Sequence, residues 1–89
     1  MDEKLRKIIE QKIDSTFEKR DEIQNIVHSL EELSSQKNSF ALGIIIGRLY
    51  NSFYYQCRRN LKRDPTEKEF SEFLEILAKR KSEFLKKIS

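Results

Sequence analysis

Residues that break regular structure are scarce in this chain, which has two Gly and one Pro among 89 residues. Because Gly and Pro are the strongest local signals for turns, so few of them indicate long helices joined by few connections. Apolar residues make up 37% of the sequence and charged residues another 37%, so the chain is poorer in apolar residues than an average globular domain. We therefore expect one small all-α domain over residues 1–89, with a limited core that association would extend.

The first helix is predicted over residues 2–35, because apolar residues recur there at spacings of three and four. This apolar stripe consists of Leu5, Ile8, Ile9, Ile13, Phe17, Ile23, Ile26, Val27, Leu30 and Leu33. The stripe thins over residues 18–22, where two capping-box patterns allow a new helix start. We favour one continuous helix about 50 Å long, whose N-terminal half can protrude from a monomer, over two shorter helices.

The second helix is predicted over residues 39–63. The polar run 34–39 forms the loop before it, with Asn38 or Ser39 as the N-cap. Apolar side chains cover more than half of the circumference of this helix, which is more than two neighbouring helices can bury. We therefore expect the domain to associate as a helical dimer or with a protein partner.

Asp64-Pro65-Thr66 is the clearest helix boundary in the sequence. The residue before a proline is driven out of the helical region, which ends the second helix. Thr66 and Glu69 then form a capping box for a third helix over residues 67–88. With two short loops, the three helices are predicted to form an up-down-up bundle with a long N-terminal helix.

Gly43 and Gly47 stand one helical turn apart on one face of the second helix, in the G-x-x-x-G spacing. Each glycine in a helix interior costs about 1 kcal/mol relative to alanine, and close approach of another helix is the natural compensation. That neighbour is either the first helix of the same chain or the same helix of a second copy. The predicted contact for self-association or a protein partner consists of Gly43, Gly47, Tyr50 and Tyr54.

Residues 38–64 form the basic part of the chain, with five Lys/Arg against one Asp. Such a cluster attracts a phosphate backbone, and interleaved tyrosine rings can stack on unpaired bases. The alternatives are an acidic protein partner and a purely structural role, in which the cations complement the negative end of the helix dipole. The residues concerned are Arg48, Tyr55, Arg58, Arg59, Lys62 and Arg63.

Four carboxylates repeat at i,i+4 spacing along the first helix, which destabilises an isolated helix by a few tenths of a kcal/mol per pair. They are Glu10, Asp14, Glu18 and Glu22. The basic end of the second helix or a basic partner could neutralise them. We favour a solvated face balanced by neighbouring lysines and arginines.

Catalytic and metal-binding functions find little support in the sequence. Cys57 lies on an apolar stripe, where a thiol is usually inert, and no phosphate-binding glycine loop or known catalytic motif occurs. His28 with Glu31 and Glu32 does not reproduce the Glu-x-x-His pairs of helical metal sites. We expect no enzymatic activity, no cofactor, no metal and no small-molecule substrate.

The compartment is inferred from what the chain lacks. The charged N-terminus has no apolar stretch of the kind a secretory signal needs. The longest apolar window, residues 40–49, is interrupted by Arg48 and is shorter than the roughly 20 residues of a membrane span. A single cysteine fits a reducing compartment. We therefore expect a cytoplasmic protein, or a nuclear one if the source has a nucleus.

Residues 61–70, which read LKRDPTEKEF, resemble a helix opening found in some bacterial sigma factors and other helical DNA-associated proteins. The shared pattern is L-x-R-x-P-T-x-x-E followed by Leu or Phe. A helix stop followed by a capping box accounts for the likeness, and no recognition helix follows it. The resemblance therefore carries no functional residue into this chain.

The sequence as a whole favours a non-enzymatic helical interaction or regulatory module that acts through self-association and protein binding. Nucleic-acid binding through the basic end of the second helix is the alternative. A third class, the amphipathic binder of membrane surfaces, is disfavoured because the core needs the apolar faces of the basic segment.

Overall fold

The computed structural model describes residues 1–88, and every regular element in that range is helical. The elements in chain order are α1 (Glu3–Glu18), α2 (Arg20–Ser29), the 3-10 helix η1 (Glu31–Leu33), α3 (Lys37–Leu61), α4 (Glu67–Lys79) and α5 (Lys81–Ile88). The all-α prediction is confirmed. The predicted number of three helices is wrong, because the first and third predicted helices are each broken.

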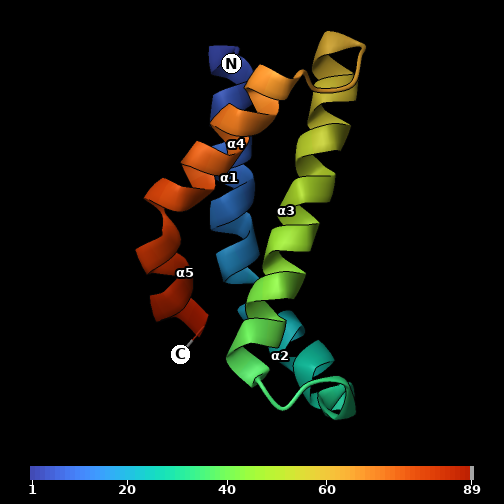
Figure 1. Ribbon diagram of the computed structural model, residues 1–89, viewed down its shortest axis with the longest axis vertical. Coiled ribbons are helices and arrows are strands. Elements are labelled where there is room, and N and C mark those ends of the chain that lie inside the picture. The colour runs from blue at the N-terminus through green and yellow to red at the C-terminus, as the bar shows by residue number, and fades with distance from the viewer. Residues whose placement is uncertain (89) are drawn as a thin grey trace.

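The chain runs along the long axis of the molecule three times, reversing after α2 and again after α3 (Figure 1). With 25 residues, α3 is about 37 Å long, close to the 39 Å extent of the whole molecule. It contacts α1, α2 and α5, so the other helices are arranged around it. One long helix therefore gives the fold its length.

The helix predicted over residues 2–35 is broken at Lys19, whose φ of −100° and ψ of 21° leave the helical range. Phe17 and Ile23 are six residues apart, so in a straight helix their side chains would point in directions about 120° apart. The break changes the direction of α2, so Phe17 and Ile23 are both buried. The first leg then ends at Leu30, and its N-terminal half does not protrude, because Leu5 is fully buried.

The helix predicted over residues 67–88 is broken at Arg80, where φ is −106° and ψ is 11°. The change of direction keeps α5 beside the rest of the molecule (Figure 1). Phe84 of α5 then meets Phe17 of α1 edge to face, with 5.1 Å between the ring centroids. Tertiary packing therefore overrides an apolar stripe that would continue in a straight helix.

The ends of α3 differ from the predicted ends by about two residues. The helix begins at Lys37, and Gln36 precedes it without a side-chain cap, so the prediction of Asn38 or Ser39 as N-cap is wrong. At the other end, Lys62 takes a left-handed conformation with φ of 60°, and its N–H donates to the Arg58 carbonyl. This residue closes the helix before the predicted end at Arg63.

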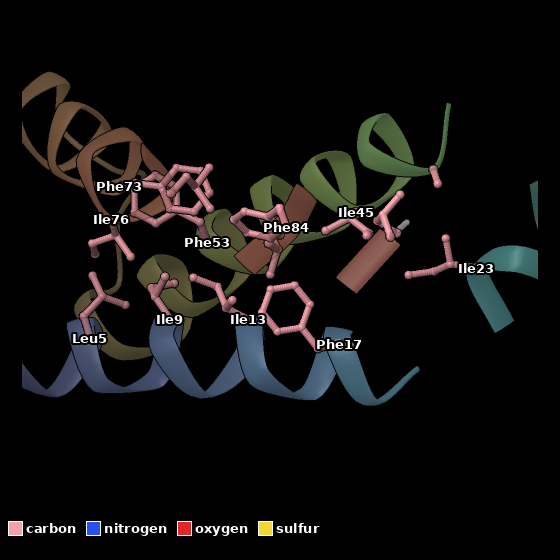
Figure 2. Close-up of a cluster of buried hydrophobic side chains, with 14 of the residues drawn as sticks. Leu5, Ile9, Ile13, Phe17, Ile23, Ile45, Phe53, Phe73, Ile76 and Phe84 are labelled. Carbon is pink, nitrogen blue, oxygen red and sulfur yellow. The ribbon is translucent and has the colours of Figure 1, made fainter. Parts of the chain in front are cut away.

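The core lies between α1, α3 and the α4–α5 leg. Figure 2 shows Leu5, Ile9, Ile13 and Phe17 of α1 directed toward the other helices. Phe53 of α3 and Phe73 of α4 stack with their centroids 4.4 Å apart and their rings parallel, and both are almost fully buried. Each such ring contributes roughly 1.5–3 kcal/mol by leaving water. The core therefore uses one side of α3 and leaves another side free.

Candidate functional site

Gly43 and Gly47 lie on the exposed side of α3. A methyl group added to either glycine would meet no other atom within 4 Å. Close packing against the first helix of the same chain, one of the two alternatives drawn from the sequence, is therefore wrong. Within residues 1–88 the chain has no packing need for glycine at these positions.

Beside Gly47, α3 and α4 enclose an apolar groove of about 200 Å³. Its walls are Ile46, Gly47, Tyr50, Phe70, Phe73, Leu74 and Leu77. None of these residues is charged, and four of their side chains are open to solvent: Ile46 by 37%, Tyr50 by 44%, Phe70 by 39% and Leu74 by 47%. Together with Gly43, these residues form the surface that we call the α3–α4 apolar face. Exposed apolar groups gathered in one place mark an interaction surface more often than scattered ones do.

The tyrosines predicted at the contact occupy different environments. Tyr50 packs edge to face against Phe70 of α4, with centroids 6.0 Å apart, and helps to wall the groove. Tyr54 is half-buried against Phe53, and Arg58 lies 5.6 Å from its ring centroid. The structure therefore brings Gly43, Gly47 and Tyr50 onto the open face, whereas Tyr54 lies at its edge.

Sequence analysis missed the contribution of α4 to this face. Phe70 and Leu74 share the helical apolar period of the buried residues in the third predicted helix, so the period alone does not set them apart. They are four residues apart and offset from the buried Phe73 and Ile76, so they form a second row on the same helix. This second row could have indicated an exposed apolar surface on α4, because a helix of this kind normally buries only one apolar stripe.

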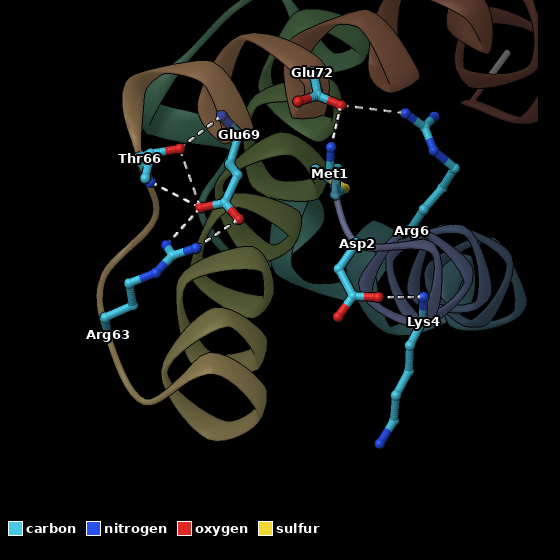
Figure 3. A network of polar contacts seen from close by, with 8 residues as sticks. All are labelled: Met1, Asp2, Lys4, Arg6, Arg63, Thr66, Glu69 and Glu72. Atoms are coloured by element: carbon cyan, nitrogen blue, oxygen red, sulfur yellow. Dashed lines mark hydrogen bonds and ion pairs between the residues drawn. The ribbon is translucent and has the colours of Figure 1, made fainter.

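The loop between α3 and α4 is held by a compact polar network (Figure 3). Thr66 and Glu69 form the predicted capping box, and Arg63 donates from both terminal nitrogens to the Glu69 carboxylate at 2.7 and 3.1 Å. The Arg63 guanidinium and the Thr66 backbone N–H hold the pKa of Glu69 at about 2, compared with an ordinary 4.5. This network fixes the angle between the two helices that wall the groove.

The middle of α4 is tied to the N-terminus of the chain (Figure 3). The Met1 ammonium lies 2.6 Å from Glu72 and the Arg6 guanidinium 3.6 Å from the same oxygen. The ammonium lowers the pKa of Glu72. Asp2 caps α1 by accepting from the Lys4 backbone N–H at 2.9 Å. Both polar clusters position α4 rather than form a reactive site.

The six residues of the predicted basic site are not assembled for one ligand. Arg58 is bound to Asp64 at 2.6 Å and Arg63 is engaged by Glu69, so two of the five cations are neutralised locally. Arg48 precedes Arg58 on the same helix by nearly three turns and pairs loosely with Glu22 at 3.9 Å. The members that point to solvent without an ion pair in residues 1–88 are Tyr55, Arg59 and Lys62.

Two carboxylates of the predicted acidic stripe, Glu10 and Asp14, are neutralised by Arg80 from the break between α4 and α5. Arg80, only 17% exposed, reaches Glu10 at 3.1 Å and Asp14 at 2.6 Å, and it also binds Glu83 at 2.7 Å. Its guanidinium lies 5.7 Å from the Phe17 ring centroid. The break between α4 and α5 is what carries Arg80 to α1. The favoured explanation, a face balanced by neighbouring cations, is therefore wrong for Glu10 and Asp14.

Cys57 and His28, the residues whose side chains could be reactive, do not form a catalytic or metal site. Cys57 is fully buried, and burial raises the pKa of its thiol. His28 is exposed on α2. Among residues 1–88 no group of three or more His, Cys, Asp or Glu side chains is arranged to hold a metal ion. No helix in the same range combines the length and apolar character needed to cross a bilayer.

Comparison with known protein families, with curated proteins and with solved structures gives no match to this chain.

Proposed function

We propose that this protein is a non-enzymatic helical interaction module that self-associates through the α3–α4 apolar face. The observation that carries the proposal is the pair Gly43 and Gly47, open to solvent beside an uncharged groove. Two interior glycines weaken α3 by about 1 kcal/mol each, and no contact within residues 1–88 compensates for them. A helix from another molecule, approaching closely over the glycines, supplies the missing contact.

A second copy of the chain suits this face because the face carries both a protruding surface and a low surface that can receive it. Ile46 and Tyr50 protrude beside the low surface of Gly43 and Gly47. A two-fold axis across α3 sets the protruding side chains of each copy over the glycines of the other, as an isologous contact requires. The molecule carries a net charge of +3, and the uncharged groove brings no like charges together at the centre of such a contact.

Sedimentation velocity over a range of protein concentrations tests this proposal. The wild-type chain is expected to change from monomer to dimer, and Leu74→Gln should weaken the dimer about tenfold or more, since each interface loses two buried leucines. Leu33→Gln is the matched control, because Leu33 is 72% exposed but lies on η1, away from the face. A monomer at all concentrations, or equal loss in both variants, contradicts the proposal.

Nucleic-acid binding keeps one specific observation in its favour, the exposed pair Arg59 and Lys62 beside Tyr55. Fluorescence anisotropy with labelled oligonucleotides tests it at about 50 and 200 mM salt, where phosphate-dominated binding weakens by orders of magnitude. The variant for this test is Arg59→Glu with Lys62→Glu, because reversal of Arg63 would also break its contact with Glu69. Binding that this variant leaves unchanged would eliminate the alternative.

A further inference from the structure

A second hollow, separate from the apolar face, lies between α1 and α3 and has a volume of about 120 Å³. Its walls are Lys12, Ser15, Thr16 and Lys19 from the α1 side, and Arg48 and Ser52 from α3. The four residues on the α1 side are spaced three, four and seven apart, and the two on α3 are four apart. Each set therefore lies on one helix face, and the two faces meet at the hollow.

Three cations and no carboxylate line this hollow, and their charge is poorly compensated. By contrast, Arg58, Arg63 and Arg80 are each engaged by a carboxylate at 2.6–2.7 Å. Lys12 and Lys19 make no ion pair within the described part of the chain, and the Glu22 oxygen reaches Arg48 only at 3.9 Å. Like charges that converge on one hollow repel each other unless an anion lies between them.

The hydroxyl groups around the hollow show which of them can donate to such an anion. The Ser15 and Thr16 hydroxyls already donate to the carbonyls of Gln11 and Lys12 in their own helix. The half-buried Ser52 hydroxyl makes no hydrogen bond within residues 1–88, so its proton is available. With two ammonium groups and one guanidinium, the hollow therefore offers donors from four side chains.

We infer that this hollow binds a phosphate group through Lys12, Lys19, Arg48 and Ser52. Its volume is several times the about 30 Å³ that one water molecule occupies, so a tetrahedral oxyanion has room. Four convergent donors call for several acceptor oxygens on one small group, and three cations favour a dianion over a single carboxylate. The phosphate is either the free inorganic ion or the terminal group of a small phosphomonoester. The site is distinct from the α3–α4 apolar face and does not depend on self-association.

NMR titration of the ¹⁵N-labelled protein with inorganic phosphate, at ionic strength held constant with sodium chloride, tests this inference. Amide shifts are expected to saturate and to concentrate at residues 12–19 and 48–52. Lys12→Gln and Lys19→Gln should each weaken the binding about tenfold, as loss of one charge-assisted hydrogen bond does. Both lysines are exposed, so the variants keep the fold, which the undisturbed part of the spectrum verifies.

Lys79→Gln is the matched control, because it removes the same charge from an exposed lysine of α4 that lies outside the hollow and makes no ion pair within residues 1–88. It should change the affinity for phosphate less than twofold. Shifts spread over all surface lysines, or equal weakening by Lys79→Gln and Lys12→Gln, would overturn the site. Titration with glycerol 3-phosphate, with glycerol as its control, separates the two sources of phosphate. If glycerol 3-phosphate binds as well as inorganic phosphate, the hollow is a phosphomonoester site. If only inorganic phosphate binds, the hollow is a site for the free ion.

Discussion

Glu69 shows how one side chain holds the angle between two helices. The residue is 8% exposed, and its carboxylate accepts from Arg63 and from the Thr66 backbone N–H and completes the capping box of α4. These contacts are strongest when the carboxylate is ionised, and for that reason the pKa of Glu69 falls to about 2. A lowered pKa in the folded state means that ionisation stabilises the fold.

Glu69→Gln is therefore expected to lower the free energy of unfolding by about 1–2 kcal/mol at pH 7, the size of a lost cap and a weakened charged hydrogen bond. The stabilisation by Glu69 is fully present above pH 4.5 and is lost as the pH falls toward 2. The difference between wild type and variant should shrink over the same window. Urea unfolding at a series of pH values measures it.

Glu75→Gln is the control for that series. Glu75 is an exposed carboxylate on the same helix and makes no ion pair within residues 1–88, so its loss should change stability little. A difference for Glu69→Gln that stays constant from pH 7 to pH 2 would mean that ionisation of Glu69 does not stabilise the fold.

Cys57 is expected to react slowly with a thiol reagent in the native protein. The side chain is fully buried on α3, and burial raises the pKa of its thiol, so little reactive thiolate forms near neutral pH. Ellman's reagent should modify it at the rate of global or local opening, and fast labelling should appear only in denaturant. Rapid labelling of the folded protein would show that Cys57 is accessible and activated.

The breaks in the first and third legs separate what was predictable from the sequence from what was not. The capping box at Thr66 was predicted because all of its atoms belong to residues close in sequence. The break at Arg80 was not, because it follows from Phe84 meeting Phe17 and from Arg80 reaching Asp14, about 66 residues away in sequence. Helix patterns show which residues are apolar along one helix, whereas these contacts depend on where the helices lie relative to each other.

Arg80 joins three helices, and its replacement should loosen α5 selectively. Arg80→Lys keeps the charge but removes the planar fork that binds Glu10, Asp14 and Glu83 together, so we expect a loss of about 1 kcal/mol in stability. The backbone amides of α5 should exchange hydrogen faster than in the wild type. The exchange rates of amides in the middle of α3 should change only as much as the free energy of global unfolding requires.

Native-state hydrogen exchange monitored by NMR measures that difference. Lys79→Ala provides the comparison, because Lys79 is an exposed cation next to Arg80 and makes no ion pair in residues 1–88. Equal exchange rates for α5 in wild type and Arg80→Lys would mean that Phe84 and Ile88 alone hold this helix.

In the whole molecule, one side of α3 belongs to the core and another side is exposed to solvent. One side buries Ile45, Leu49 and Phe53 in the core, and another side presents Gly43, Gly47 and the groove to solvent. The sequence predicted the surplus of apolar surface on this helix. It could not show which part α1 would cover, because both apolar sides follow the same helical period.

Gly43 and Gly47 are expected to affect the monomer and the proposed dimer in opposite directions. In the monomer, Gly43→Ala with Gly47→Ala meets open space and replaces two poor helix formers, so it should stabilise the chain by about 1–2 kcal/mol. In the proposed dimer, the added methyl groups hold the two α3 helices apart and weaken association. Asn25→Ala, at an exposed position of α2, is the control that improves helix propensity away from the face.

Sedimentation velocity on this double variant, paired with urea unfolding at a concentration where the wild type is monomeric, is the most direct measurement. We expect the double variant to be a more stable monomer that dimerises at least about tenfold more weakly than the wild type, while Asn25→Ala dimerises normally. A double variant that is more stable and associates as well as the wild type would contradict it, because the glycines would then have no role in contact between copies.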